Sequence, residues 1–150
     1  MKIFCKIIVL FILISGCDYK PIFSSKNSSF GISNFKLINE NKLSRSIKKA
    51  LSNYTDLSKK KILTLEIDVK KIKEVTSKNS KGNISSYRVN IYCNFKIYEN
   101  KKLLKSKKIT ESFLYSNREN KFEFKKYESE IEKNLLNKII QELIIELYSI

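Results

Sequence analysis

Histidine and tryptophan are absent from the 150 residues, and glycine and proline occur only three times and once. Without histidine the chain lacks the commonest general base of enzymes and a leading ligand of zinc. The three glycines, Gly16, Gly31 and Gly82, are too far apart to form a phosphate-binding loop. We therefore assign no catalytic residue and no metal ligand, and we expect a protein that is not an enzyme.

An N-terminal apolar run is present, but it is short. Two lysines occur in the first six residues, and residues 7–14 are uniformly apolar. This run is too short to cross a bilayer, which takes about 20 residues, and it is typical of a cleaved leader. It ends in Ile14-Ser15-Gly16-Cys17, which resembles the lipobox of bacterial lipoproteins.

The lipobox residues have a chemical role in processing. Small residues such as Gly16 let the backbone enter the lipoprotein signal peptidase, and the thiol of Cys17 is the nucleophile that takes a diacylglyceryl group. We predict a signal peptide over residues 1–16, cleavage between Gly16 and Cys17, and a lipid-bearing Cys17. The alternative is an ordinary secretory leader followed by a chance cysteine.

Cleavage would leave 134 residues, enough for one domain with a modest core. Residues 17–29 hold the sole proline and a polar serine-rich run, which is typical of a tether, so we predict a single domain over residues 30–150. With Cys5 removed and Cys17 acylated, Cys93 has no partner for an intrachain disulfide. Its apolar neighbours indicate a small buried hydrophobic residue.

Negative charge is also scarce, since 15 acidic residues face 30 basic ones. Loss of Lys2 and Lys6 with the leader would lower the formal charge from +15 to +13. Outside the cytoplasm this charge favours phosphorylated lipid headgroups or lipopolysaccharide over nucleic acid. Lysine, asparagine, isoleucine and serine dominate the whole chain, as they do when a coding sequence is rich in A and T, so charge supports this partner class without establishing it.

Apolar and polar residues alternate in four segments, which predicts four strands. The segments are 30–38, with a break near Ser33-Asn34, 61–75, with a bulge or twist after Lys70-Lys71, 87–98 and 103–115. The polar segments 77–83 and 99–101 are predicted hairpin turns, so the last three strands form an antiparallel meander.

Two segments instead have helical spacing. Leu43, Ile47, Ala50 and Leu51 predict a short amphipathic helix that follows Asn41. A longer apolar stripe predicts a terminal helix, and it comprises Ile131, Leu135, Leu136, Ile139, Ile140, Leu143, Ile144 and Leu147. Residues 129–132 fit a capping box, although an earlier start is open. The order β-α-β-β-β-α predicts a two-layer α+β sandwich with both helices on one face of a mainly antiparallel sheet.

Several short motifs resemble one lipoprotein family. The segment 17–23, Cys-Asp-Tyr-Lys-Pro-Ile-Phe, is similar to the start of the alphaproteobacterial form of the lipopolysaccharide-assembly lipoprotein LptE. Segments 86–91 and 94–98 resemble the arginine-bearing strand of that family and its end. With the order of elements, the similarity runs over nearly all of residues 13–150.

The resemblance implies an outer-membrane lipoprotein held by a diacylglyceryl group and an N-acyl chain, such as palmitate, on Cys17. It would plug an LptD-type β-barrel, help the barrel assemble and engage lipopolysaccharide during its insertion into the outer leaflet. Two departures stand out: Asp18 replaces glycine, which in enteric bacteria favours retention in the inner membrane, and the strand from Leu103 lacks a glycine. The alternative function is a periplasmic accessory or scaffold lipoprotein that binds no lipopolysaccharide.

For lipopolysaccharide contact the sequence points to the first hairpin. Arg88 begins the strand after it, and Lys78 and Lys81 lie in the loop. A guanidinium can hold two phosphate oxygens while lysines add positive potential. The alternative is that all three are solvated hairpin charges, in which case the Lys70-Lys71-Lys73 segment becomes the next basic candidate.

Overall fold

A computed structural model describes residues 28–150, so the predicted signal peptide, Cys17 and all but the last two residues of the predicted tether lie outside the described residues. The described elements follow in the order β1 (Phe30–Leu37), α2 (Lys42–Ala50), the short 3-10 helix η2 (Ser52–Tyr54), β2 (Lys61–Lys78), β3 (Ile84–Glu99), β4 (Lys102–Ser116) and α3 (Lys121–Tyr148). This order confirms the predicted α+β class.

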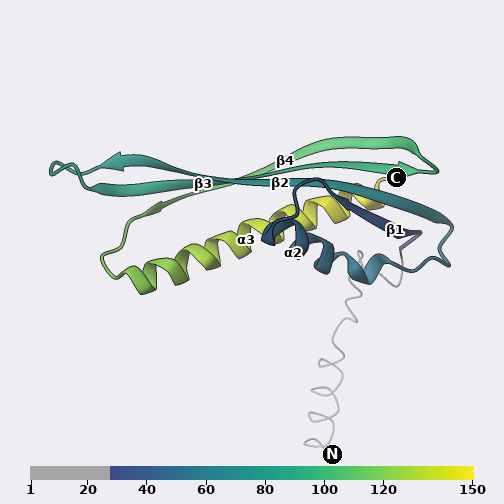
Figure 1. The fold of residues 1–150 in the computed structure, drawn as a ribbon, viewed down its shortest axis with the longest axis horizontal. Helices are drawn as coiled ribbons and strands as arrows, with labels where there is room; N and C mark the ends of the chain where they lie inside the picture. The colour runs from purple at the N-terminus through teal and green to yellow at the C-terminus, as the bar shows by residue number, and fades with distance from the viewer. Residues whose placement is uncertain (1–27) are drawn as a thin grey trace, which may run out of the picture.

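The four strands form one sheet in the order β1-β2-β3-β4. Strand β1 pairs with β2 in parallel, whereas the β2–β3 and β3–β4 pairs are antiparallel. A parallel pair needs a crossover connection, and α2 with η2 supplies it, while two hairpins suffice for the other pairs. The sheet is long and twisted, and its β2–β3 hairpin extends beyond the start of α3 (Figure 1).

The predicted irregularities are partly correct. The break in the first strand is confirmed, because the β1–β2 register shifts between Ile32 and Asn34. After Lys70-Lys71 the sequence predicted a bulge or a twist, and the bulge is wrong. Pairing with β3 continues there without a register shift, and the first irregularity comes after Val75. The strand also continues to Lys78, so the loop of this hairpin is limited to residues 79–83.

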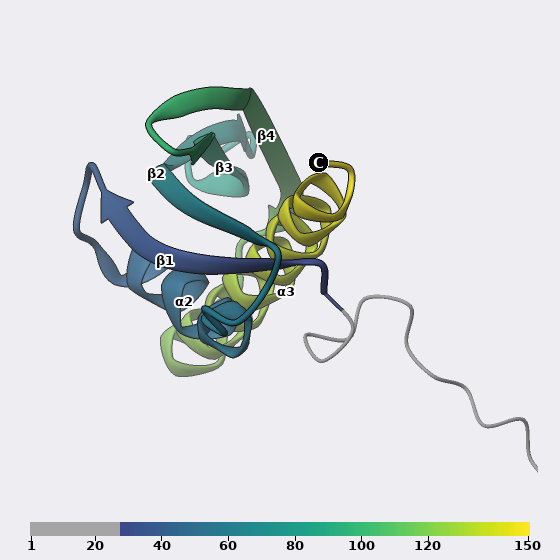
Figure 2. The ribbon, with the colours of Figure 1, turned by 90° about the vertical axis from the view of Figure 1, so that its right-hand side faces the viewer.

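Both helices cover the same face of the sheet, with α2 beside β1 and β2 and α3 running beneath β3 and β4 (Figure 2). The alternating strand residues on this face and the α3 stripe form one core. Its fully buried members include Phe30, Leu63, Leu65, Ile67, Ile91, Phe95, Ile97, Ile139 and Leu143. Cys93 is also fully buried, as predicted, whereas Ala50 of the predicted α2 stripe is exposed.

Each of the two described α-helices begins directly after an asparagine whose side chain caps its N-terminus. Asn41 caps α2 as a capping box, accepting from the backbone N–H of Ser44 while the Ser44 hydroxyl accepts from that of Asn41. Helix α3 begins at Lys121, because the Asn120 side chain accepts from the next free N–H groups. The earlier start that the sequence left open is therefore confirmed, and the capping box predicted at residues 129–132 is wrong, because Ser129 lies inside the helix.

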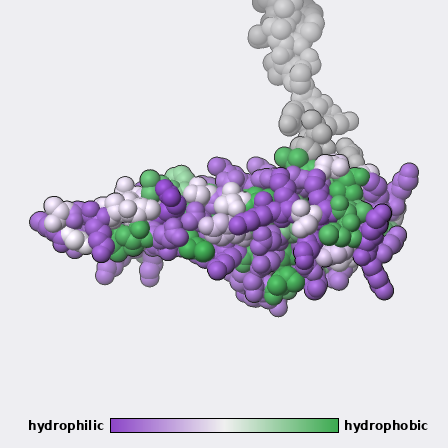
Figure 3. Space-filling model, turned by 90° about the horizontal axis from the view of Figure 1, so that it is seen from above, coloured by the Kyte–Doolittle hydropathy of each residue, from purple (hydrophilic) through white to green (hydrophobic). Residues whose placement is uncertain are grey.

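The opposite face of the sheet is open and polar over most of its area (Figure 3). Cross-strand partners there include Lys36, Glu66 and Lys96, and the glutamate accepts from both lysines at 2.9 and 3.1 Å. Asp68 accepts from Asn39 and Asn94 in the next row. The predicted division into a helix-covered face and an open face is confirmed. Within residues 28–150 no helix has both the length and the apolar character needed to cross a membrane.

Candidate functional site

The core face of β2 changes character halfway along the strand. From Leu63 to Val69 the residues on this face are buried and apolar, but Lys71 and Lys73 occupy the next two positions of the same parity. Because successive side chains of a strand alternate between faces, both lysines point beneath the sheet, toward α3. Helix α3 presents Glu128 and Glu132 to them, four residues apart and thus on one side of the helix.

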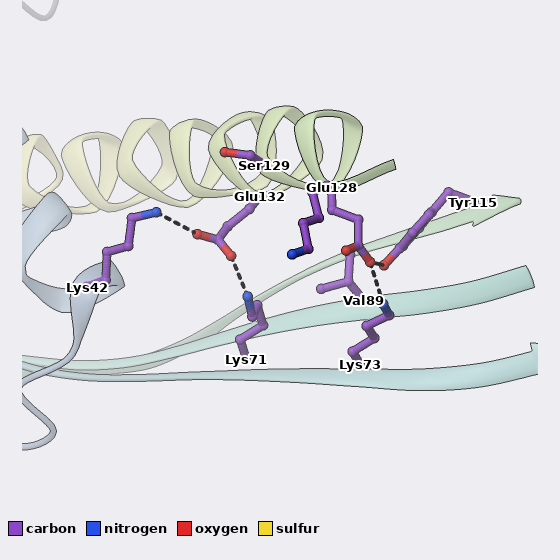
Figure 4. A pocket seen from close by; sticks show the side chains of 9 residues that line it. Lys42, Lys71, Lys73, Val89, Tyr115, Glu128, Ser129 and Glu132 are labelled. Carbon is purple, nitrogen blue, oxygen red and sulfur yellow. Dashed lines mark hydrogen bonds and ion pairs between the residues drawn. The ribbon is translucent and has the colours of Figure 1, made fainter. Parts of the chain in front are cut away.

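These side chains line a cleft of about 230 Å³ between the two layers (Figure 4). Glu132 accepts from Lys71 at 2.5 Å and lies 3.8 Å from Lys42 of α2. Glu128 accepts from Lys73 at 2.5 Å and from the hydroxyl of Tyr115 at 2.6 Å. Lys125 also lines the cleft, so four lysines face two glutamates and leave a positive excess.

An aromatic cluster closes the cleft toward the β2–β3 hairpin. Tyr87, Tyr115, Phe124 and Tyr127 contact one another with ring centroids 5.6 to 6.1 Å apart. The Lys73 ammonium lies 4.0 Å from the centroid of Tyr87 and 5.1 Å from that of Phe124. Cation–π attraction therefore adds to the ion pair that holds this lysine.

The contacts around Glu128 lower the pKa of this glutamate and raise the pKa of Tyr115. Burial acts to raise the pKa of Glu128, but hydrogen bonds from Lys73 and Tyr115 outweigh it and hold that pKa below the usual 4.5. Burial raises the pKa of Tyr115 far above its usual range, and the hydrogen bond to the Glu128 carboxylate raises it further. The carboxylate is thus ionised at neutral pH while the phenol keeps its proton as the donor.

Substituting Glu128 with glutamine is expected to change how the free energy of unfolding depends on pH below neutrality. A folded-state pKa below 4.5 means that Glu128 stabilises the fold above about pH 5 and loses this contribution as the pH falls through the folded pKa. Glu128→Gln should therefore lower the free energy of unfolding by about 1 kcal/mol near pH 7 and by much less near pH 3. Urea unfolding of the variant and of the parent chain at a series of pH values measures the loss in free energy of unfolding at each pH. The exposed Glu130→Gln is the control, and an equal pH slope in the two variants would contradict the expectation.

The structure separates the three residues that the sequence nominated for lipopolysaccharide contact. Arg88 is exposed on the open face of β3, where its cross-strand partners are Glu74 and Leu114. Lys78 is the last residue of β2 and is paired with Ile84 of β3. Ile84 and Arg88 are four residues apart along β3, a distance of about 13 Å at about 3.3 Å per residue. The three therefore do not form one compact cluster.

The hairpin loop itself is built around Asn79. Its side-chain oxygen accepts from the backbone N–H groups of Lys81 and Asn83, and Gly82 takes the positive φ of +80° that the turn requires. Lys81 is exposed in this turn. Lys78 lines a shallow depression together with Arg118, whose guanidinium lies 3.9 Å from the ring centroid of Tyr127. Arg118 is thus a basic residue of this region that the sequence analysis did not identify.

Cys93 is the cysteine of the described residues, and its thiol is buried. Burial, with the Asp68 charge adding to it, raises the pKa of Cys93 to about 12, so its thiol stays protonated at neutral pH. Among residues 28–150, no group of three or more histidine, cysteine, aspartate or glutamate side chains is placed to hold a metal ion.

The ionic cleft was also missed at the level of sequence, although a signal for it exists. Lys71 and Lys73 keep the parity of the buried positions Ile67 and Val69, so their charges require partners beneath the sheet. The prediction was instead a bulge or twist after Lys70-Lys71, which ends the regular alternation before Lys73. Keeping the parity and searching the terminal helix for acids four residues apart would have found the cleft.

No protein-family model matches the chain, and no curated protein matches it. Solved structures of bacterial lipoproteins are similar to it. Rare lipoprotein B from Shewanella oneidensis is 14% identical, with a TM-score of 0.60 over 77% of this chain and 94% of that one. Uncharacterized lipoprotein B from Nitrosomonas europaea is 12% identical, with a TM-score of 0.63 over 81% and 86%.

A minor lipoprotein from Acinetobacter baumannii is similar to the same extent. It is 12% identical, with a TM-score of 0.60 over 79% of this chain and 90% of that one. At such identities the likeness lies in the fold, and it extends over nearly the whole length of each lipoprotein. The two-layer domain described here is therefore the fold of these bacterial lipoproteins.

Proposed function

We propose that this chain is a lipid-anchored outer-membrane protein that occupies the lumen of an LptD-type β-barrel, helps the barrel assemble and engages lipopolysaccharide. The observation that carries the proposal is the fold, which is shared with bacterial lipoproteins over about four-fifths of the chain. The lipobox at residues 14–17 supports the same class independently, because it is a motif of the sequence and not a property of the fold.

The surfaces suit the proposed role. The open sheet face carries lysine, asparagine and tyrosine side chains, including Lys96, Asn94 and Tyr92, and such a face fits the polar interior of a large barrel. The basic β2–β3 hairpin projects past the helices and offers cations to the phosphate groups of lipopolysaccharide. The role requires binding surfaces and no catalytic group, so we also propose that the protein is not an enzyme.

A second candidate is a periplasmic scaffold lipoprotein retained at the inner membrane, which Asp18 directly after the lipidated cysteine favours. Affinity purification of the full-length chain from detergent-solubilised membranes, followed by mass spectrometry, separates the two. Recovery of a large outer-membrane barrel in near-stoichiometric amount supports the plug. Its absence, with the chain in the inner-membrane fraction, would support the scaffold.

Charge reversal tests the lipopolysaccharide contact. Lys78→Glu with Lys81→Glu and, separately, Arg88→Glu remove cations from the hairpin and from the adjacent strand. If these residues hold phosphate, each variant should bind lipopolysaccharide at least about tenfold more weakly at low salt, because a charge-assisted hydrogen bond contributes about 1.5–3 kcal/mol. Binding is measured with immobilised lipopolysaccharide at two ionic strengths, since screening should reduce the difference.

The matched control reverses two lysines at the other end of the sheet. Lys101→Glu with Lys102→Glu in the β3–β4 hairpin changes the net charge by the same amount as the double variant above. Equal losses at the two hairpins would show that binding follows overall charge and not this site. Retained binding in both test variants would reject the nominated residues.

A further inference from the structure

The outer edge of β4 has no strand partner within residues 28–150. Strand β4 is the last in the sheet and pairs only with β3. Figure 2 shows it standing at one side of the sheet above α3. Its 15 residues therefore present a long row of backbone N–H and C=O groups that can pair with another extended chain.

The two edges of the sheet differ in their protection against such pairing. Strand β1 at the other edge is only eight residues long and is interrupted by a bulge, both of which discourage strand addition. The first half of β4 carries four lysines, which also protect an edge. Residues 109–116 contain neither lysine nor proline, and Phe113 and Leu114 there are 42% and 55% exposed.

A groove of about 480 Å³ runs beside this less protected half. Phe113 forms one wall, and α3 forms the other with Tyr127, Ile131, Asn134 and Lys138 among its lining residues. Phe113 is on the helix-facing side of β4, since it is paired with the buried Val89. A strand added to β4 would lie about 4.8 Å from it, and every second side chain would point into the groove.

We propose that this edge is a docking site for an extended segment of a partner protein, which adds to the sheet as a fifth strand. Its alternate apolar side chains would fill the groove between Phe113 and α3. Its acidic side chains would lie against the lysine-rich first half of β4. The proposal does not depend on lipopolysaccharide binding.

Charge identifies the kind of segment. Strand β4 has four lysines and one glutamate, and Lys105 and Lys107 are paired with glutamates of α3. Lys102 and Lys108 make no ion pair with an acidic residue of the described chain, so an acidic segment would neutralise them. A second copy would instead bring an equally basic chain, with 30 basic and 15 acidic residues, against this one, which like-charge repulsion disfavours.

The test uses the full-length chain, expressed with its own leader and purified in detergent. The probe is a fluorescent, capped peptide of about ten residues in which valine alternates with threonine in the first half and with glutamate in the second. We expect saturable binding, and hydrogen exchange should show new protection of the amides of residues 109–116. Replacing the glutamates of the peptide with lysine should weaken binding at least about tenfold at low salt.

Two tryptophan substitutions on neighbouring exposed residues of α3 provide the matched pair. Asn134→Trp fills the groove beside β4, whereas Lys133→Trp adds the same bulk to the flank that faces α2. Binding should fall at least about tenfold in the first variant and less than about twofold in the second. Thermal unfolding of both variants verifies that each is folded.

Three results would overturn the proposal. One is equal binding by the two tryptophan variants, or protection of amides elsewhere than in β4. Another is sedimentation of the free chain as a dimer that Phe113→Asp dissociates, which would assign the edge to a second copy. The third is protection of the β4 amides in the free monomer that disappears when residues 17–27 are deleted, which would assign the edge to the chain's own N-terminal segment.

Discussion

Replacing Cys17 with serine is expected to abolish acylation and leave the precursor unprocessed. Diacylglyceryl transfer requires the nucleophilic thiol, and a serine hydroxyl with its much higher pKa does not replace it. Lipoprotein signal peptidase acts after this transfer, so residues 1–16 should remain attached. The effect should be close to all-or-none, and mass spectrometry of the membrane-bound protein measures both the N-terminus and the lipid mass.

Cys5→Ser is the control for this experiment, because it removes a thiol from the predicted leader without touching the lipobox. This variant should be acylated and cleaved as the parent chain is. A mature N-terminus at another residue, carrying no lipid mass, would contradict the prediction. That outcome would instead support an ordinary secretory leader.

Truncating Leu143 to alanine is expected to remove a large part of the stability of the domain. Leu143 is fully buried between α3 and the sheet, where its side chain belongs to the single core that both layers share. Removing such a side chain leaves a cavity and typically costs about 2–5 kcal/mol, against a total of about 5–15 kcal/mol for a domain. Chemical and thermal unfolding of the variant should show a strongly lowered midpoint.

Ile145→Ala is the matched control, since it shortens an aliphatic side chain of the same helix that is 48% exposed. Its effect on the free energy of unfolding should stay below about 1 kcal/mol. Glu142→Ala should also have a small effect, because the ion pair that Glu142 makes with Lys107 lies at the surface. Comparable losses at positions 143 and 145 would mean that α3 is not oriented as described.

Most of the fold follows from local patterns that the sequence displays openly. The alternation along β3, from Val89 to Ile97, correctly predicts the buried apolar side chains, because neighbouring residues of a strand face opposite sides of the sheet. The apolar stripe of α3 and the Asn41 cap of α2 were predicted for equally local reasons. The polar segment 77–83, with its one glycine, likewise predicted the hairpin turn, which the structure limits to residues 79–83.

The errors arise where a long-range contact overrides a local pattern. The ion pairs of Lys71 and Lys73 join residues 61 and 55 positions apart, so the local parity indicates which face of the sheet the lysines occupy but not that α3 lies there. At the start of α3 two local patterns competed. The capping box at residues 129–132 was the more conspicuous, but the strand ends at Ser116 and Asn120 caps the first available turn.

The sequence by itself determined the α+β class of the fold and predicted a lipoprotein. The lipobox, the basic charge and the order of strands and helices are properties of short segments and of composition, so they can be read without knowing which segments meet. Only the tertiary structure decided where the surfaces lie. The pairing of β1 with β2 left β4 as the longer of the two edge strands, and the path of α3 beneath β3 and β4 created both the ionic cleft and the groove beside Phe113. Such surfaces depend on the packing of elements distant in sequence, and no local pattern specifies that packing.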